Sequence, residues 1–199
     1  MITLAPEQCD PAIIDLLLQH QVIVSAGHSN ATYVQAREAF DLGIPTATHL
    51  YNAMSSLQHR EPGLVGAIFD HPAVMSSIVC DGVHVDYAAV RIAKAVMKER
   101  LFFITDAVAE TTTGEYQHLF QGDRYALPDG TLSGSALSMM QCVKNGVEYA
   151  GIPLDEALRM AATYPAQLVR DRKMGLLAKG YEANMVVFDE ALQVQQVII

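Results

Sequence analysis

Short runs of apolar, β-prone residues alternate with amphipathic stretches along most of this chain, and no other feature constrains its fold as much. The apolar runs predict strands at residues 22–24, 46–49, 74–80 and 101–104. The amphipathic stretches predict helices over residues 31–42, 86–99, 135–150 and 153–164. Continuous apolar strands that alternate with amphipathic helices are typical of a parallel sheet covered by helices, so we expect an α/β fold.

Residues that favour helix ends support these boundaries. Asn30 is expected to cap the first helix, and Gly43 is expected to end it. Asp86 is expected to cap the second helix, and Pro153 is expected at the first position of the last one. Between residues 117 and 132, the turn dipeptides Gly-Asp and Asp-Gly separate β-prone pieces, which predicts an inserted β-hairpin.

Charge and composition exclude several classes of protein. The chain carries 13 basic and 22 acidic side chains, for a formal net charge of −9, which argues against nonspecific binding to nucleic acid. No apolar run is long enough to span a membrane, and the first residues lack the basic and apolar regions of a signal peptide. Cys9, Cys80 and Cys142 have no metal-site spacing and are expected to be reduced thiols of a cytoplasmic protein.

Candidate catalytic residues follow three of the predicted strands. His28 and His49 come after the first two strands, and Asp106 comes after the last. The carboxyl ends of parallel strands meet on one face, so these side chains are expected to converge there. Two neutral imidazoles and a carboxylate suit a divalent metal, which lowers the pKa of a bound water to about 7. A nearby aspartate can take the proton of that water and return it to a leaving group.

The same residues also have purely structural interpretations. His28 and His49 would then be hydrogen-bonded core histidines, and Asp106 would cap a turn. Arg60, followed by Glu61-Pro62-Gly63, would belong to a solvated turn, and His84 would only orient a loop. No role is assigned to the remaining histidines, His20, His59, His71 and His118. Composition and periodicity alone therefore indicate an α/β enzyme and leave its dependence on a metal open.

Six segments, in the same order along the chain, resemble the N-acetylglucosamine-6-phosphate deacetylases of the amidohydrolase superfamily. They are SAGHSNAT (25–32), THLYNAM (48–54), REPGL (60–64), DGVHVD (81–86), TDA (105–107) and GTLSGS (130–135). The resemblance runs over nearly the whole chain. It implies that His28 and His49 bind the catalytic metal, and that Asp106 activates the attacking water and later protonates the departing amine.

The resemblance also implies a binding site for a phosphosugar. Asn52 and Ala53 match positions that contact the sugar phosphate. Arg60 and His84 match groups that bind the 6-phosphate from the neighbouring subunit, which implies a homodimer. The loop of Leu132, Ser133 and Gly134 matches a further substrate-binding segment. A guanidinium binds phosphate through two parallel hydrogen bonds, so an acidic protein can still hold such a substrate.

The implied reaction is hydrolysis of the N-acetyl group of N-acetylglucosamine 6-phosphate, which yields glucosamine 6-phosphate and acetate. One divalent ion is expected, with zinc preferred and iron, cobalt or manganese as alternatives. A related amidohydrolase, such as a dihydroorotase or an adenine deaminase, is an alternative that Arg60, His84 and the LYNAM run argue against.

The implied fold is the C-terminal half of a TIM-type (β/α)8 metal-dependent hydrolase barrel with remnants of a small β-sandwich. Residues 1–174 would form the barrel part, with about five strands, and residues 175–199 would form incomplete sandwich strands, with β patterns at 184–188 and 194–199. Members of the family are nearly twice as long, and their first half supplies a glutamate ligand of the metal. The chain would then be either part of a working deacetylase or a catalytically incomplete fragment of one.

Overall fold

The computed structural model describes residues 1–114 and 116–199 and contains a five-stranded parallel sheet. The strands pair in chain order, and they are β1 (Ile2–Leu4), β2 (Val24–Ala26), β3 (Thr46–Ala47), β4 (Met75–Ile78) and β5 (Leu101–Phe103). This sheet confirms the expected α/β class and the parallel arrangement of its strands. The strands at 46–49 and 74–80 are shorter than predicted, because their last residues belong to the turns that follow.

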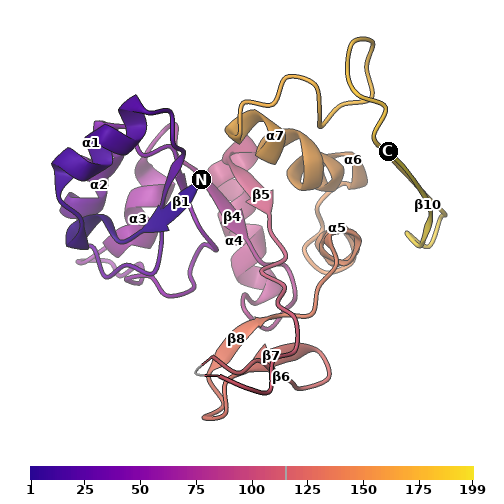
Figure 1. Ribbon diagram of the computed structural model, residues 1–199, viewed down its shortest axis with the longest axis horizontal. Coiled ribbons are helices and arrows are strands. Elements are labelled where there is room, and N and C mark those ends of the chain that lie inside the picture. The colour runs from indigo at the N-terminus through magenta and orange to yellow at the C-terminus, as the bar shows by residue number, and fades with distance from the viewer. Residues whose placement is uncertain (115) are drawn as a thin grey trace.

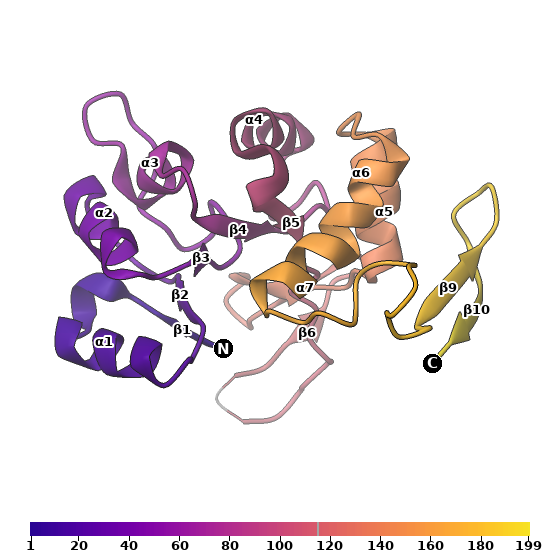
Figure 2. The same cartoon turned by 90° about the horizontal axis from the view of Figure 1, so that it is seen from above.

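Helices follow the strands and lie outside them. Figure 2 shows α1 to α4 as an arc around the strands, with α5 to α7 continuing beyond β5. The helices are α1 (Pro11–Gln19), α2 (Tyr33–Leu42), α3 (Gly63–Asp70), α4 (Tyr87–Met97), α5 (Met139–Glu148), α6 (Leu154–Leu158) and α7 (Tyr164–Leu168). Short turns of other helix types are η1 (Pro6–Gln8), η2 (Lys98–Arg100) and η3 (Arg159–Thr163).

The cap predicted for α2 was wrong by two residues. Thr32, not Asn30, caps the helix, because its hydroxyl accepts from the backbone N–H of Gln35 while the Gln35 side chain accepts from the N–H of Thr32. This reciprocal capping box provides acceptors for two backbone N–H groups, those of Thr32 and Gln35, whereas an asparagine cap alone would provide an acceptor for one. Asp86 caps α4 and Gly43 ends α2, as predicted.

The boundaries of the two last predicted helices also needed correction. The first begins at Met139, capped by Ser138, because residues 132–135 form a strand instead. The second is capped by Pro153 and runs past residue 164 to Leu168. It passes through the π-helical turn η3, where the Tyr164 N–H donates to the carbonyl of Arg159, five residues earlier. The following Pro165 has no N–H to donate, so it cannot continue the α-helical hydrogen-bond pattern at this point.

Helix α3 was not predicted, since Pro62-Gly63 reads as a turn in the sequence. Gly63 has φ +61°, and a Cβ there would lie 2.7 Å from the carbonyl oxygen of Ser55. The glycine therefore allows the start of a buried helix to pack directly on the preceding loop.

Two small antiparallel sheets lie outside the parallel sheet. The first contains β6 (Leu119–Phe120), β7 (Arg124–Ala126) and β8 (Leu132–Ser135), so the predicted hairpin gains a third strand. The second is a hairpin of β9 (Met185–Phe188) and β10 (Val194–Ile198). Figures 1 and 2 show this hairpin beyond α5 and α6, away from the parallel sheet. The division into units at 1–174 and 175–199 stays a prediction.

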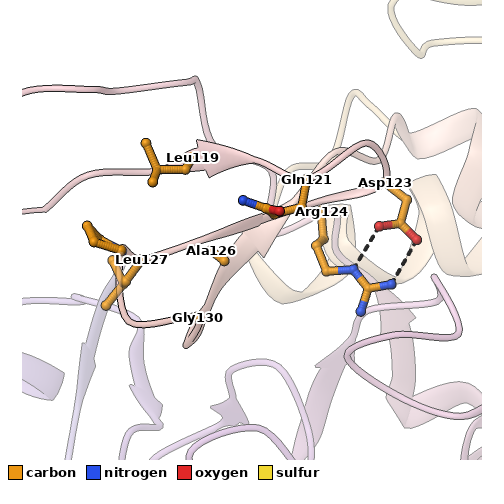
Figure 3. A pocket seen from close by; sticks show the side chains of 8 residues that line it. Leu119, Gln121, Asp123, Arg124, Ala126, Leu127 and Gly130 are labelled. Atoms are coloured by element: carbon orange, nitrogen blue, oxygen red, sulfur yellow. Dashed lines mark hydrogen bonds and ion pairs between the residues drawn. The ribbon is translucent and has the colours of Figure 1, made fainter.

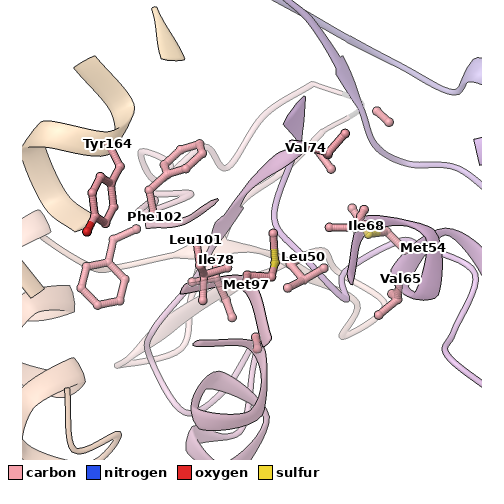
Figure 4. Close-up of a cluster of buried hydrophobic side chains, with 14 of the residues drawn as sticks. Leu50, Met54, Val65, Ile68, Val74, Ile78, Met97, Leu101, Phe102 and Tyr164 are labelled. Carbon is pink, nitrogen blue, oxygen red and sulfur yellow. The ribbon is translucent and has the colours of Figure 1, made fainter. Parts of the chain in front are cut away.

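The hydrophobic core lies between the parallel sheet and the helices that cover it. Ile78 of β4 and Leu101 of β5 are fully buried, and they pack in the same cluster as Ile68 of α3 and Met97 of α4 (Figure 4). Leu50, directly after the candidate ligand His49, is also fully buried. The residues next to the candidate site are therefore fixed by core packing. In the described part of the chain, no helix is both long enough and apolar enough to cross a membrane.

Replacement of Ile78 by alanine should destabilise the protein by about 2 to 5 kcal/mol, because it removes packed atoms and leaves a cavity. Ile92→Ala on the outer face of α4 is the matched control, since that side chain is 59% exposed, and it should change the free energy of unfolding by less than about 0.5 kcal/mol. Urea denaturation measures both. Equal effects of the two substitutions would contradict this placement of the core.

The three cysteines should differ in reactivity at pH 8. Burial raises the pKa of both Cys80 and Cys142 to about 12, so their reactive thiolate forms are scarce, whereas Cys9 is partly exposed. Titration with a chromogenic disulfide reagent should show one fast thiol per chain. The fast phase should disappear in Cys9→Ser, and a fast phase that persists in this variant would show that a buried thiol is accessible.

Candidate active site

Three predicted residues lie at the same edge of the parallel sheet. His28 follows β2, His49 follows β3 and Asp106 follows β5, each two or three residues after the strand. The ring centroids of His28 and His49 are 4.8 Å apart, with the rings edge to face. Asp106 is close enough to His49 for its charge to affect the pKa of the imidazole. The strand order therefore brings the three predicted groups together.

The backbone at these residues is in the left-handed region, which is unfavourable for side chains other than glycine. The φ angles are +49° at His28, +40° at His49 and +52° at Asp106. Tyr51 and Ala53, in the turn after His49, share this property. Each such residue costs on the order of 1 kcal/mol or more, and strain of this kind clusters at functional sites.

His49 has the properties of an unsatisfied ligand. Its side chain is buried, and its Nδ1 has no hydrogen-bond partner among the residues that the structure describes. Burial lowers the pKa of His49, so the imidazole is neutral at pH 7 and has a lone pair to offer. A buried polar atom without a hydrogen-bond partner destabilises a protein. A metal ion would be a suitable partner for Nδ1 of His49.

The two imidazoles thus fit a divalent metal, but they do not complete a coordination shell. Within residues 1–114 and 116–199, no group of three or more histidine, cysteine, aspartate or glutamate side chains has a metal-binding arrangement. A metal held by His28 and His49 would need further ligands or water. Asp106 lies beside this pair, where it can act on a water or a leaving group.

Two polar residues that sequence analysis missed hold the histidines in place. The backbone N–H of His49 donates to Ser77 Oγ at 2.8 Å, and the next N–H donates to the Ser77 carbonyl. Glu7 holds the turn after His28, because its carboxylate accepts from Ser29 Oγ at 2.6 Å and from the N–H of Asn30 at 2.8 Å. The sequence marks Ser77 and Glu7 only as polar residues in or just after a strand, so neither could be identified from the sequence alone.

The loops predicted to contact the substrate lie against these groups. The Asn52 N–H donates to the carbonyl of His49, and the Ala53 carbonyl accepts from the N–H of Ser29, so both residues adjoin the histidines. On the other side, the Ser135 N–H donates to the carbonyl of Asp106 at 2.9 Å.

This second contact places the predicted Leu132-Ser133-Gly134 segment of β8 next to the candidate catalytic aspartate. A Cβ at Gly134 would lie 2.8 Å from Val108, so the close approach needs glycine. Ser133 Oγ lies 3.0 Å from Nδ1 of His118, a residue to which the sequence assigned no role.

The two predicted phosphate-binding residues have different surroundings. Arg60 is exposed and lines a cavity of about 520 Å³ beside the start of α2, and its guanidinium makes no ion pair with the described residues. The His84 side chain is only 5% exposed and pairs with Asp81. In the part of the chain that the structure describes, no hydrogen bond joins Arg60 or His84 to His28, His49 or Asp106.

A second cavity, of about 420 Å³, lies against the three-stranded sheet of β6 to β8 (Figure 3). Arg124 lies on the wall of this cavity and donates two hydrogen bonds to the carboxylate of the neighbouring Asp123. None of its lining residues is a predicted site residue, so this cavity is separate from the candidate active site.

Comparison with known proteins gives a consistent result. The sequence matches the Amidohydrolase family over residues 8–199. It is 42% identical to an N-acetylglucosamine-6-phosphate deacetylase of Haemophilus influenzae over 87% of this chain and 48% of that protein. It is 37% identical to an N-acetylgalactosamine-6-phosphate deacetylase of Escherichia coli O157:H7 over 100% of this chain and 55% of that protein.

The structure is also similar to the crystal structure of N-acetylglucosamine-6-phosphate deacetylase from Pasteurella multocida. The TM-score is 0.95 at 37% identity, over 100% of this chain and 54% of that one. The chain therefore spans about half the length of the relatives it matches. The ordered site residues, the parallel sheet and these matches agree, and the chain belongs to the amidohydrolase family.

Proposed function

We propose that this chain takes part in metal-dependent hydrolysis of the N-acetyl group of N-acetylglucosamine 6-phosphate. The observation that carries the proposal is the convergence of His28, His49 and Asp106 on strained turns at one edge of the sheet. The buried Nδ1 of His49 has no hydrogen-bond partner among the described residues. The names of similar proteins support a phosphosugar amide as the substrate. The runner-up is that these 199 residues are a catalytically incomplete portion of such an enzyme.

His28 and His49 would hold the metal, for which zinc is the first choice and iron, cobalt or manganese are alternatives, since two imidazoles beside a carboxylate would accept any of the four. When bound, a divalent metal supplies polarisation of the amide carbonyl and a nucleophile at neutral pH. The turn that contains Asn52 and Ala53 adjoins both histidines, so it would bind the sugar next to the scissile amide.

Asp106 would act as the general base and then as the general acid. Its carboxylate takes a proton from the attacking water, and it later gives that proton to the departing amine, so that glucosamine 6-phosphate and acetate leave as products. The hydrogen bond from the Ser135 N–H to the backbone carbonyl of Asp106 keeps this residue beside the Leu132-Ser133-Gly134 segment, which would contact the substrate.

Arg60 and His84 would bind the 6-phosphate across the interface of a homodimer. The exposed guanidinium of Arg60, which makes no ion pair with described residues, suits contact with another molecule. We also propose that residues 1–174 form a barrel part and residues 175–199 a separate β-sandwich part. A cytoplasmic location is proposed from the three cysteines, which are all free.

Acetate release from N-acetylglucosamine 6-phosphate should be measurable with this chain in the presence of zinc, with bound metal determined in the same sample. His49→Ala should lose metal, and Asp106→Asn should keep the metal while activity falls by about 100-fold or more, because proton transfer is lost. Replacement of His20, to which no role is assigned, is the matched control for His49 and should change neither quantity.

The outcomes separate the proposals. If acetate is released faster from N-acetylgalactosamine 6-phosphate than from N-acetylglucosamine 6-phosphate, the galactosamine epimer is the substrate. The absence of both turnover and stoichiometric metal would support the incomplete-enzyme alternative. Metal binding that survives in His49→Ala would contradict the assigned site.

Glu7→Ala should weaken zinc binding although Glu7 is not assigned as a ligand. The variant releases the turn after His28, since the side chain of Ser29 and the N–H of Asn30 lose their acceptor. A loss of about 1 to 3 kcal/mol in the free energy of unfolding is expected as well. Glu38→Ala on the exposed face of α2 is the control, and competition with a chromogenic chelator measures zinc affinity. Equal affinities in the two variants would contradict the role of Glu7.

A further inference from the structure

The loop after β4 folds back on itself through the side chain of Asp81. One carboxylate oxygen, Oδ1, accepts from the backbone N–H groups of Val83 at 2.9 Å and His84 at 2.8 Å. Gly82 has φ +75°, and a Cβ there would lie 2.8 Å from the ring of Tyr87. Glycine is therefore needed between Asp81 and His84 for this turn to form.

The other carboxylate oxygen of Asp81 forms a hydrogen bond with the imidazole of His84. Oδ2 lies 2.5 Å from Nδ1, and both side chains are only 5% exposed. Burial pushes the pKa of Asp81 upward, but hydrogen bonds from the His84 side chain and from the two backbone N–H groups outweigh it and leave the pKa below its ordinary value. Asp81 is thus an ionised carboxylate, which can only accept, so Nδ1 of His84 must carry a proton.

This contact decides what the opposite nitrogen of His84 can do. With Nδ1 protonated, Nε2 can donate to an anion only when the imidazole is doubly protonated and positively charged. A positive charge on a nearly buried side chain needs a negative partner within hydrogen-bond distance. Asp81 is that partner.

The geometry points to Asp81 as a positioning residue that fixes the proton on Nδ1 of His84 and supports a charged imidazole for binding the phosphate of the substrate through Nε2. This inference rests on the proposed function, in which His84 binds the 6-phosphate. Asp81 itself is not expected to contact the substrate, because both of its carboxylate oxygens are bound within the loop. Its effect should therefore appear only where a phosphate is present.

Asp81→Asn tests this role with little change of shape. The backbone N–H groups of Val83 and His84 bind the amide oxygen of the new asparagine where they bound Oδ1 of Asp81. The NH2 group of the asparagine then faces Nδ1 of His84. Nδ1 must then become an acceptor, and the proton moves to Nε2. The matched control is Asp86→Asn, which removes the same charge at the exposed cap of α4, where asparagine also caps well.

Nitrogen-15 NMR of the histidine rings should show Nδ1 of His84 protonated in the unmodified chain and in Asp86→Asn, but not in Asp81→Asn. Added N-acetylglucosamine 6-phosphate should shift the Nε2 resonance of His84 in the unmodified chain. Asp81→Asn should bind this phosphosugar about 10-fold more weakly, because its neutral imidazole still donates from Nε2 but lacks the positive charge that strengthens a hydrogen bond to phosphate. Its affinity for unphosphorylated N-acetylglucosamine should not change.

Each outcome decides the matter. An unprotonated Nδ1 in the unmodified chain overturns the inference even if Asp81→Asn fails to fold. Equal weakening for both sugars shows a purely structural role for Asp81, and absence of any phosphosugar effect on His84 overturns its part in binding. Phosphosugar binding with the expected NMR shifts but no acetate release would leave the inference standing and would count against the proposed reaction alone.

Discussion

Parallel pairing of five short strands in chain order is the constraint on which the rest of this structure depends. Each strand has only two to four residues. Because the strands are parallel, the turns that follow them all begin at the same edge of the sheet. A helix leads from each strand to the next and buries the apolar residues of the sheet on its outer side. The candidate catalytic residues that follow β2, β3 and β5 therefore meet, although His28 and Asp106 are 78 positions apart in the sequence.

Three buried serines hold the turns in which these residues adopt left-handed backbone angles. Ser29 links the turn after His28 to Ala53, Ser77 accepts from the backbone of His49, and Ser135 binds the backbone on both sides of Asp106. Each joins one strand end to a neighbouring segment, so the backbone strain at the site is offset by hydrogen bonds that depend on the whole sheet. These hydrogen bonds define the backbone of the site without any contribution from a metal or substrate.

Much of the fold and of the site could be predicted from the sequence, and the misses have physical causes. Apolar runs predicted β2 to β5 to within about two residues, because continuous hydrophobicity reports burial on both faces, whereas β1 was not among the predicted strands. The convergence of His28, His49 and Asp106 was predicted because the carboxyl ends of parallel strands share one edge, and their roles stay a proposal. Helix α3 was missed since Gly63 signals a turn unless the contact with Ser55 is known. Glu7, Ser77 and Asp81 act through contacts between loops or within one, and the spacing of residues does not reveal such contacts.

X-ray absorption at the zinc edge, on the chain loaded with one equivalent of zinc, tests the central claim most directly. The account predicts nitrogen neighbours at about 2.0 to 2.1 Å with the outer-shell scattering of two imidazoles. In His28→Ala and in His49→Ala, the imidazole scattering should be lost together with the bound zinc, which leaves the oxygen neighbours of hydrated zinc. Sulfur at about 2.3 Å, or imidazole scattering that is unchanged in both variants, would contradict the assignment of these two histidines as metal ligands.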